Sequence, residues 1–139
     1  MPRETVNIKI LEGAGIVDVT TTLQLDVIRG LRLGTVSAGI KTQGRKDLVL
    51  IELSVGTQCA AVFTQNAFCA APVTVAKEHM SASEAGVRYL LVNTGNANAG
   101  TGDPGIQASK KCCEAVAAVA GVRAQDVLPF STGVIGEPL

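Results

Sequence analysis

The sequence predicts an α+β fold, in which mixed β-sheets carry helices. In its first half, apolar and polar side chains alternate with a period of two, which is typical of half-buried strands. In its second half, a helical apolar pattern lies between two short apolar runs, as in a strand-helix-strand unit. The chain has 139 residues and no internal repeat, low-complexity tract or linker, so residues 1–139 are expected to belong to a single domain.

Glycines separate the alternating stretches of the first half. Val6, Ile8 and Ile10, for example, are separated by polar residues, and the next stretches follow the same pattern. The strands predicted by alternation are 6–10, 17–19 and 23–27. A short segment follows over 35–40, and two further strands are predicted over 48–53 and 59–64. Residues 42–47 form a polar turn before the fifth of these stretches. The first half is therefore expected to be a meander of short strands.

The elements expected in the second half are a helix over 72–82, a strand over 87–93, a polar loop over 94–102, a helix over 104–120 and a strand over 127–131. The second helix has start and stop signals. Asp103 is suited to the N-cap and Pro104 to the first helical position, while Gly121 terminates the helix. One face of this helix is expected to carry Ile106, Cys113, Val116 and Ala120, with Lys110 and Lys111 toward solvent.

Charge and composition exclude several classes of partner. The 12 basic and 12 acidic residues cancel, which argues against a nucleic acid or an acidic membrane. No apolar run is long enough to span a membrane and no signal-peptide core follows Met1, so a cytoplasmic protein is expected. The chain is 47% hydrophobic and only 17% charged, which predicts that a partner chain or the rest of the protein covers part of its surface.

The usual nucleophile and metal motifs are missing from the sequence. The spacing of Cys59, Cys69, Cys112 and Cys113 suits neither a disulfide nor a tetrahedral metal site, and we expect these cysteines to be small buried hydrophobes. His79, the single histidine, falls late in a predicted helix, where it is expected to interact with the helix C-terminus rather than act as a base.

A glycine-rich segment raises an alternative function. Gly100 to Gly105 match the pattern G-x-G-x-x-G, and the acidic Asp126 follows about 20 residues later, which suggests a module that binds an anion or a nucleotide. Two facts oppose a dinucleotide site: residues 94–99 separate the predicted strand from the glycines, and Asp126 precedes its strand instead of ending one. The asparagines of the preceding loop, 93–100, are suited to binding an anion, to supporting a neighbouring loop or to satisfying their own backbone.

The last predicted strand ends in Thr132-Gly133. A hydroxyl and the adjacent backbone N–H at the end of a strand are two donors that can hold the oxyanion of a tetrahedral acyl-transfer intermediate. A Thr-Gly pair at a strand end is also a common turn, so both interpretations stay open.

Six segments, taken together, are similar to one family of enzymes. They are Ala38 to Lys41, Arg45 to Leu48, Ala61 to Asn66, Cys69 to Val73, Val92 to Ala99 and Ser131 to Glu137. In this order they resemble the amino-terminal part of the bifunctional ornithine acetyltransferase / N-acetylglutamate synthase family of arginine biosynthesis. The first 30 or so residues are not anchored by this resemblance.

The resemblance implies a four-layer α/β/β/α architecture like that of the N-terminal-nucleophile hydrolases, with residues 1–139 as a partial domain from the α chain. Members of the family cleave themselves before an internal Thr, and the resulting α and β chains are expected to assemble as α2β2. They transfer acetyl from N-acetylornithine to glutamate through an acetyl-Thr intermediate, without a cofactor, and bifunctional members also use acetyl-CoA as a substrate.

In the family's pattern the Thr-Gly of the last segment forms the oxyanion hole, which implies this role for Thr132 and Gly133. The sequence ends at Leu139, before the family's substrate-binding Lys and Thr and before its nucleophilic Thr. No residue of the chain is therefore assigned as nucleophile, and the 139 residues alone are expected to be inactive.

Overall fold

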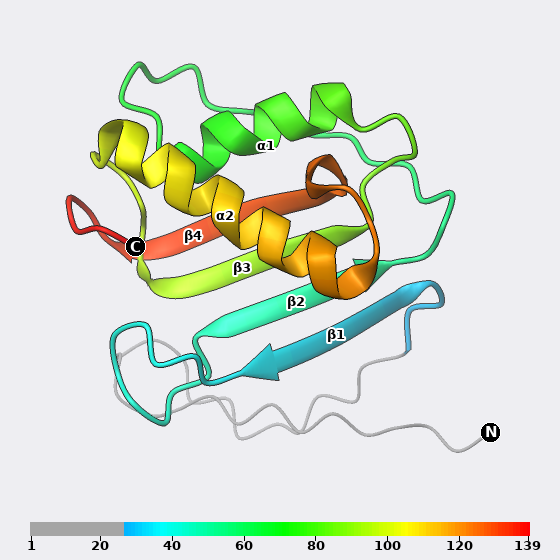
Figure 1. Ribbon diagram of the computed structural model, residues 1–139, viewed down its shortest axis with the longest axis horizontal. Coiled ribbons are helices and arrows are strands. Elements are labelled where there is room, and N and C mark those ends of the chain that lie inside the picture. The colour runs from blue at the N-terminus through cyan, green and yellow to red at the C-terminus, as the bar shows by residue number, and fades with distance from the viewer. Residues whose placement is uncertain (1–26) are drawn as a thin grey trace, which may run out of the picture.

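A computed structural model of the chain describes residues 27–139, which form one mixed β-sheet with two α-helices on one face (Figure 1). The elements in chain order are β1 (Leu31–Val36), β2 (Leu48–Leu53), α1 (Ala71–Ala82), β3 (Tyr89–Asn96), α2 (Gly102–Ala120), the 3₁₀ turn η1 (Ala124–Asp126) and β4 (Val127–Val134). The predicted α+β class is confirmed. No helix of the described residues is long and apolar enough to cross a membrane.

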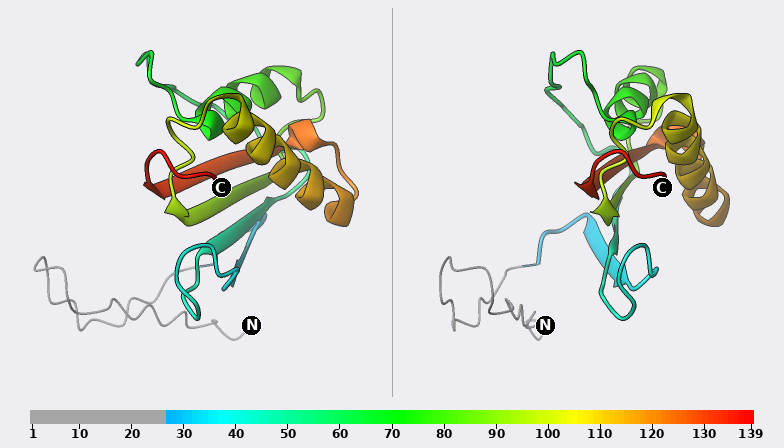
Figure 2. Two further views of the ribbon diagram at one scale, coloured as in Figure 1. Left: turned by 60° about the vertical axis from the view of Figure 1, so that its left-hand side comes forward. Right: turned by 90° about the vertical axis from the view of Figure 1, so that its left-hand side faces the viewer.

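The strands follow one another across the sheet in the order β1-β2-β3-β4. β1 pairs with β2 and β2 with β3 in antiparallel fashion, whereas β3 and β4 are parallel. A parallel pair requires a crossover connection, and α2 provides it. Figure 2 shows both helices on the same side of the sheet. The C-terminal ends of β3 and β4 therefore lie at one edge of the sheet.

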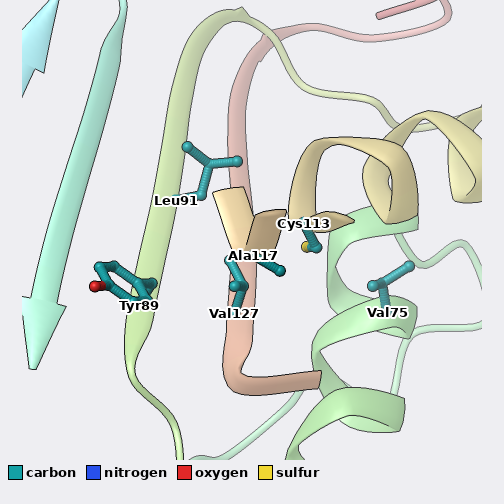
Figure 3. Packing of buried hydrophobic residues seen from close by; sticks show 6 residues of the cluster. All are labelled: Val75, Tyr89, Leu91, Cys113, Ala117 and Val127. Atoms are coloured by element: carbon teal, nitrogen blue, oxygen red, sulfur yellow. The ribbon is translucent and has the colours of Figure 1, made fainter. Parts of the chain in front are cut away.

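The core lies between the helices and the sheet. Alternate residues of β3 face the helices, so Tyr89 and Leu91 belong to one buried cluster with side chains from α1, α2 and β4 (Figure 3). The buried residues of this cluster are Val75, Tyr89, Leu91, Cys113, Ala117 and Val127. Small residues dominate on the helix side, which allows α2 to approach the sheet closely.

No helix of the described residues covers the opposite face of the sheet. Strand register places Val49, Val92 and Phe130 side by side on this face, and Leu33 lies next to them along β1. Leu33 is 61% exposed and Phe130 is 43% exposed. The expectation that the folded chain exposes apolar surface is met here, and alternation along β4 places Thr132 on the same face.

The first half of the chain differs from the predicted meander. The predicted strands over 6–10 and 17–19 lie outside the described residues, as does the 23–27 strand except for Val27, which belongs to no strand. The segment expected over 35–40 was misplaced: β1 includes Gly34 and ends at Val36. It stops there because the N–H groups of Ala38 and Ile40 donate to the Asp47 carboxylate instead of to a strand.

The predicted strand over 59–64 was also wrong, because these residues form irregular structure. Their apolar run does not correspond to a buried strand: Val62 is fully exposed, and only Phe63 packs against the core. The strand predicted over 48–53 is confirmed as β2. The register and twist of a sheet depend on its partners, which local alternation cannot identify.

The second half is close to the prediction, with shifted boundaries. The helix expected over 72–82 is α1, and both later strands are longer than expected, with β3 reaching Asn96 and β4 reaching Val134. The expected loop over 94–102 therefore begins only after Asn96. Pairing of β3 with β4 extends both strands beyond their apolar runs.

Helix α2 begins earlier than expected. Its N-cap is Thr101, so Asp103 does not cap it and lies instead in the first turn. The buried residues of α2 are Gly105, Ser109, Cys113 and Ala117. Of the predicted face, only Cys113 is buried, and Ile106, Val116 and Ala120 are half-buried. Gly121 terminates the helix with φ 68°, as predicted. Lys111 is exposed, but Lys110 forms an ion pair with Glu78 at 2.8 Å.

Candidate functional site

Thr132 and Gly133 lie at the exposed C-terminal end of β4. In the parallel ladder, Thr132 is level with Thr94 and Gly133 is level with Gly95. Among the described residues, no hydrogen bond involves the Thr132 hydroxyl. The pair thus presents a hydroxyl on the uncovered face of the sheet, beside the place where β3 ends.

Gly133 approaches the backbone of β3 more closely than any side chain would permit. Its φ is +137°, and a Cβ atom built on it would lie 2.3 Å from the carbonyl carbon of Gly95 and 2.5 Å from the nitrogen of Asn96. The ladder is irregular at this point, since Asn96 pairs with both Thr132 and Val134. Such a bulge turns the following backbone and is often found next to functional sites.

The three asparagines of residues 93–100, two in β3 and one just after it, are buried and bonded to protein groups. Asn93 donates to the Asn96 carbonyl at 2.9 Å, and its own oxygen accepts from Ser131 Oγ. Asn98 donates to the Gly105 carbonyl at 2.9 Å and accepts from Thr101 Oγ1. The polar side chains therefore support the loop and its neighbours, and the alternative in which these asparagines bind an anion is not supported.

Asn96 makes the connection to the segment that follows β4. Its Nδ2 donates to the carbonyls of Glu137 at 3.0 Å and Pro138 at 2.9 Å, while its Oδ1 accepts from the Asn98 N–H at 2.7 Å. Within the described residues, no buried side-chain nitrogen or oxygen is left without a partner. The asparagines thus form a satisfied polar network beneath the exposed Thr132-Gly133 pair.

A second loop, residues 37–47, borders the same edge of the sheet. The buried Asp47 carboxylate accepts N–H donors from Ala38 at 2.6 Å and Ile40 at 2.7 Å. Burial by itself would raise the pKa of Asp47, but these backbone donors outweigh it and lower the pKa. Asp47 thereby fixes the turn that leads to Lys41.

Lys41 contacts both sides of the candidate site. A Cβ atom on Gly95 would lie 3.0 Å from Lys41 Cβ, and Lys41 Nζ pairs with a Glu137 carboxylate oxygen at 2.5 Å. Both ends of this ion pair are partly exposed, so it adds little stability by itself. It does place a cation near the end of β4.

The glycine-rich motif does not form a dinucleotide site. Asp126 precedes β4, whereas Gly100 to Gly102 follow β3, and the two strands are parallel, so these groups lie at opposite edges of the sheet. Ser83 and Arg123 already bind the Asp126 carboxylate; burial would raise its pKa, but these partners lower it. The pocket beside Gly100 has a volume of about 210 Å³, below the 300 Å³ or more typical of ligand pockets.

The cysteines and His79 do not contribute to the site. Cys113 is buried, and burial raises its pKa to about 12, as expected for an inert core thiol. The prediction was wrong for Cys59, which is exposed in the irregular segment, whereas Cys69 and Cys112 are half-buried. The described residues contain no group of three or more His, Cys, Asp or Glu arranged to hold a metal ion.

His79 lies in the last turn of α1, as predicted, but its partner is different. It is buried, and its Nδ1 donates to the Val127 carbonyl at the start of β4, at 2.8 Å. Thr132 lies near the other end of that strand. His79 therefore joins α1 to β4 and is not positioned to act on a group bound at Thr132.

Comparison with known proteins identifies the family. The profile of the ArgJ family matches residues 32–139, which is most of the chain. The chain belongs to the ArgJ family. The similarity seen in six segments is thereby confirmed.

Several ArgJ proteins are similar in sequence. The arginine biosynthesis bifunctional protein ArgJ of Methylococcus capsulatus is 61% identical over 117 residues, and that of Pseudomonas syringae pv. tomato is 57% identical over 115 residues. The matches cover 84% and 83% of this chain but only 28% of either relative. The chain thus spans a little over a quarter of the length of these ArgJ proteins.

Two solved structures are similar at 36% identity and a TM-score of 0.73: ArgJ of Bacillus halodurans, and the ornithine acetyltransferase of Mycobacterium tuberculosis in complex with ornithine. Each match covers 80% of this chain, and 57% and 60% of the respective structure. ArgJ structures have a fold like that of the N-terminal-nucleophile hydrolases. The expected fold class is therefore confirmed, with residues 27–139 supplying one sheet and the helices on one of its faces.

The sequence suggested Thr132 and Gly133 as site residues and singled out the asparagines of 93–100, but it did not place these groups or Lys41 at one site. Gly95, Asn96 and Lys41 meet this pair only because β3 and β4 are neighbours and the loop 37–47 folds back over the end of β3. The signal present in the sequence was the concentration of asparagine and glycine directly after an apolar run.

Proposed function

We propose that this chain is the amino-terminal part of a glutamate N-acetyltransferase of arginine biosynthesis, which transfers acetyl from N-acetylornithine to glutamate. Membership in the ArgJ family supports the reaction class. The observation that carries the proposal is the Thr132-Gly133 pair, which is exposed at the end of β4 and whose backbone lies close to that of Gly95 in β3. One relative of similar structure is complexed with ornithine, the product that loss of acetyl from N-acetylornithine would give.

In the proposed mechanism, a Thr hydroxyl attacks the acetyl carbonyl and forms a tetrahedral intermediate with a negative oxygen. The Thr132 hydroxyl and the Gly133 N–H donate to that oxygen. As the intermediate collapses and the C–N bond breaks, the proton of the attacking hydroxyl passes to the ornithine nitrogen, so ornithine leaves as the amine and the acetyl group stays on the Thr as an ester. The glutamate amine then attacks the acetyl-Thr ester and releases the free hydroxyl.

The attacking Thr is proposed to be the first residue of a β chain produced by self-cleavage, as the family's pattern implies. This β chain is proposed to cover the apolar sheet face that carries Phe130 and Leu33, in an α2β2 assembly. Acetyl-CoA is proposed as a second acetyl donor, no cofactor is required by the chemistry, and the cytoplasm is the proposed location.

The test is an assay of the intact protein with N-acetylornithine and glutamate. We expect release of ornithine and formation of N-acetylglutamate, with an acetylated Thr peptide found by mass spectrometry after mixing with N-acetylornithine alone. Residues 1–139 expressed alone are expected to show no turnover. An intact, folded protein without transfer activity would contradict the proposal, as would turnover by residues 1–139.

The alternative of a nucleotide-binding module is tested by titration calorimetry with NAD. The opposite placement of Asp126 and Gly100 leads us to expect no binding heat. Saturable binding that is lost when Gly100 and Gly102 are replaced would favour the alternative instead.

A further inference from the structure

Buried asparagines hold the chain on both sides of the Thr132-Gly133 pair. On the N-terminal side, Ser131 Oγ donates to Asn93 Oδ1 at 2.5 Å. On the C-terminal side, Asn96 Nδ2 donates to two successive carbonyls, those of Glu137 and Pro138. Asn93 is 7% exposed and Asn96 is 4% exposed, so water competes little for these bonds.

Asn96 itself has a fixed orientation. Its backbone is the irregular position of the ladder, level with both Thr132 and Val134. Its side-chain oxygen accepts from Asn98 N–H, and its carbonyl accepts from Asn93 Nδ2. Every polar group of the side chain is therefore engaged, and rotation of the amide would break three hydrogen bonds at once.

The segment after Gly133 has few other restraints. Val134 to Leu139 are exposed, so apolar packing does not fix them. Two backbone bonds, from Ala97 to Val134 and from Gly136 to Ala99, and the exposed Lys41–Glu137 ion pair complete the contacts. Since an exposed ion pair contributes little, the two part-buried Asn96 bonds are the main side-chain restraint on this segment.

We propose that Asn96, together with Asn93, is a positioning residue for the oxyanion donors of Thr132 and Gly133. Neither asparagine touches substrate in this scheme; they act through the backbone on the two sides of the donor pair. The inference rests on the proposed function. An oxyanion hole requires its donors at 2.7–3.1 Å from the developing charge, and a 1 Å misplacement lowers turnover by about 10²-fold.

The test compares Asn96→Asp with Asn98→Asp in the intact enzyme. Both changes are nearly isosteric, both occur at buried positions at or just after the end of β3, and both replace an amide donor that faces a backbone carbonyl. Asn98, however, is bonded to Gly105 in α2 and not to the segment after Gly133. Both variants are expected to have lower melting temperatures, and the kcat of each is measured on purified, self-cleaved enzyme.

For Asn96→Asp we expect kcat to fall by about 10- to 100-fold with KM within about twofold, because the lost alignment matters only when the oxyanion forms. For Asn98→Asp we expect a smaller fall in kcat, because its side chain is bonded to Gly105 and only its backbone N–H reaches Asn96. A milder variant, Ser131→Ala, releases only the Asn93 contact and is expected to lower kcat by about 3- to 10-fold. If Asn96→Asp does not fold, Ser131→Ala tests the positioning role in its place.

The possible failures are distinguishable. No acetyl transfer by the unaltered enzyme would overturn the proposed function and this inference with it. Transfer by the unaltered enzyme, combined with equal kcat values for the Asn96→Asp and Asn98→Asp variants, would overturn the inference alone. If Asn96→Asp cannot be isolated, an unchanged kcat in Ser131→Ala has the same meaning.

Discussion

Gly133 and Gly95 lie level on two parallel strands, and their backbones approach so closely that a methyl group on Gly133 would be 2.3 Å from the Gly95 carbonyl carbon. No side chain of L configuration fits between them. The close approach places the C-terminal end of β4 directly beside the C-terminal end of β3. Both strand ends and the donors they carry are thus fixed relative to one another.

Gly133→Ala retains the backbone N–H but is expected to separate the strand ends. The φ of +137° and the contact with Gly95 both oppose a Cβ atom, so the free energy of unfolding should fall by about 1–3 kcal/mol. Urea unfolding measures this loss, and kcat should decrease as well. Gly34→Ala is the control, since a Cβ there meets nothing within 4 Å. Equal stability of the Gly133→Ala and Gly34→Ala variants would contradict the close approach of Gly133 to Gly95.

Thr132→Ala is expected to act on turnover and not on stability. Its hydroxyl is exposed and has no partner among the described residues, so the melting temperature should stay within about 1 °C. Loss of one oxyanion donor should lower kcat by about 10²–10³-fold, or about 3–4 kcal/mol, with little change in KM.

Thr132→Ser keeps the hydroxyl and should recover most of this activity. Thr35→Ala is a matched control, because Thr35 lies on the same sheet face but in β1. If Thr132→Ala had a lower melting temperature but a kcat within about twofold of the unaltered value, Thr132 would have only a structural role at the end of β4.

Asp47→Asn is expected to destabilise the protein in a pH-dependent way. The folded-state pKa of Asp47 is lowered, so its carboxylate stabilises the fold above its ordinary pKa, and this stabilisation is lost as the pH falls through the lower folded-state value. The difference in melting temperature between the unaltered protein and the variant should be constant from about pH 7 to pH 5 and shrink below about pH 4.

Glu114→Gln, on the exposed face of α2, provides the comparison for Asp47→Asn. Its melting temperature should follow that of the unaltered protein throughout. If the difference in melting temperature between the unaltered protein and Asp47→Asn grew as the pH fell, backbone donors could not be stabilising the Asp47 carboxylate in the folded state.

Gly105→Ala should reverse the usual effect of this substitution in a helix. Alanine normally stabilises a helix interior by about 1 kcal/mol relative to glycine. Here the added Cβ would lie 1.9 Å from Thr101 Oγ1 and 2.4 Å from Asn98 Oδ1, so a loss of about 1–3 kcal/mol is expected. Ala118→Gly, at an exposed position of the same helix, measures the intrinsic preference of a helix for Ala over Gly. A stabilising Gly105→Ala variant would refute the close packing at the start of α2.

Cys113 should resist alkylation in the native protein. With its pKa raised to about 12, only roughly one thiol in 10⁴ is ionised at about pH 8. Peptide mass spectrometry after treatment with iodoacetamide should find Cys113 unmodified and the exposed Cys59 modified. Under denaturing conditions both should react. Rapid native labelling of Cys113 would mean that the contact between α2 and the sheet opens readily.

The sequence predicts best the elements whose signals are local. The apolar run of β2, the periodicity of α2 and the stop at Gly121 depend on neighbouring residues alone, and all three are confirmed. The ends of β3 and β4 are different, because each strand continues only as far as the other offers a partner. The segment 59–64 is apolar over most of its length but pairs with no strand of the described residues.

The candidate site shows the same division. Thr132 and Gly133 were identified from their own residue types, and their catalytic role stays a prediction. The contribution of Asn96 depends on a bulge between strands that are distant in sequence. That of Lys41 depends on a loop held in place by a buried carboxylate. Such relationships follow from register and packing, which a single sequence does not specify.

The polar network around Thr132 and Gly133 lies almost entirely within one strand-helix-strand crossover, from Tyr89 to Pro138. Most of its side-chain contacts join residues 38 to 42 positions apart, so they can form only after the crossover has brought β3 and β4 together. The donor pair should therefore reach its final geometry only when β3 and β4 have paired. In the proposed enzyme, a nucleophile that docks at this end of the sheet would meet donors whose positions the strand pairing has already fixed.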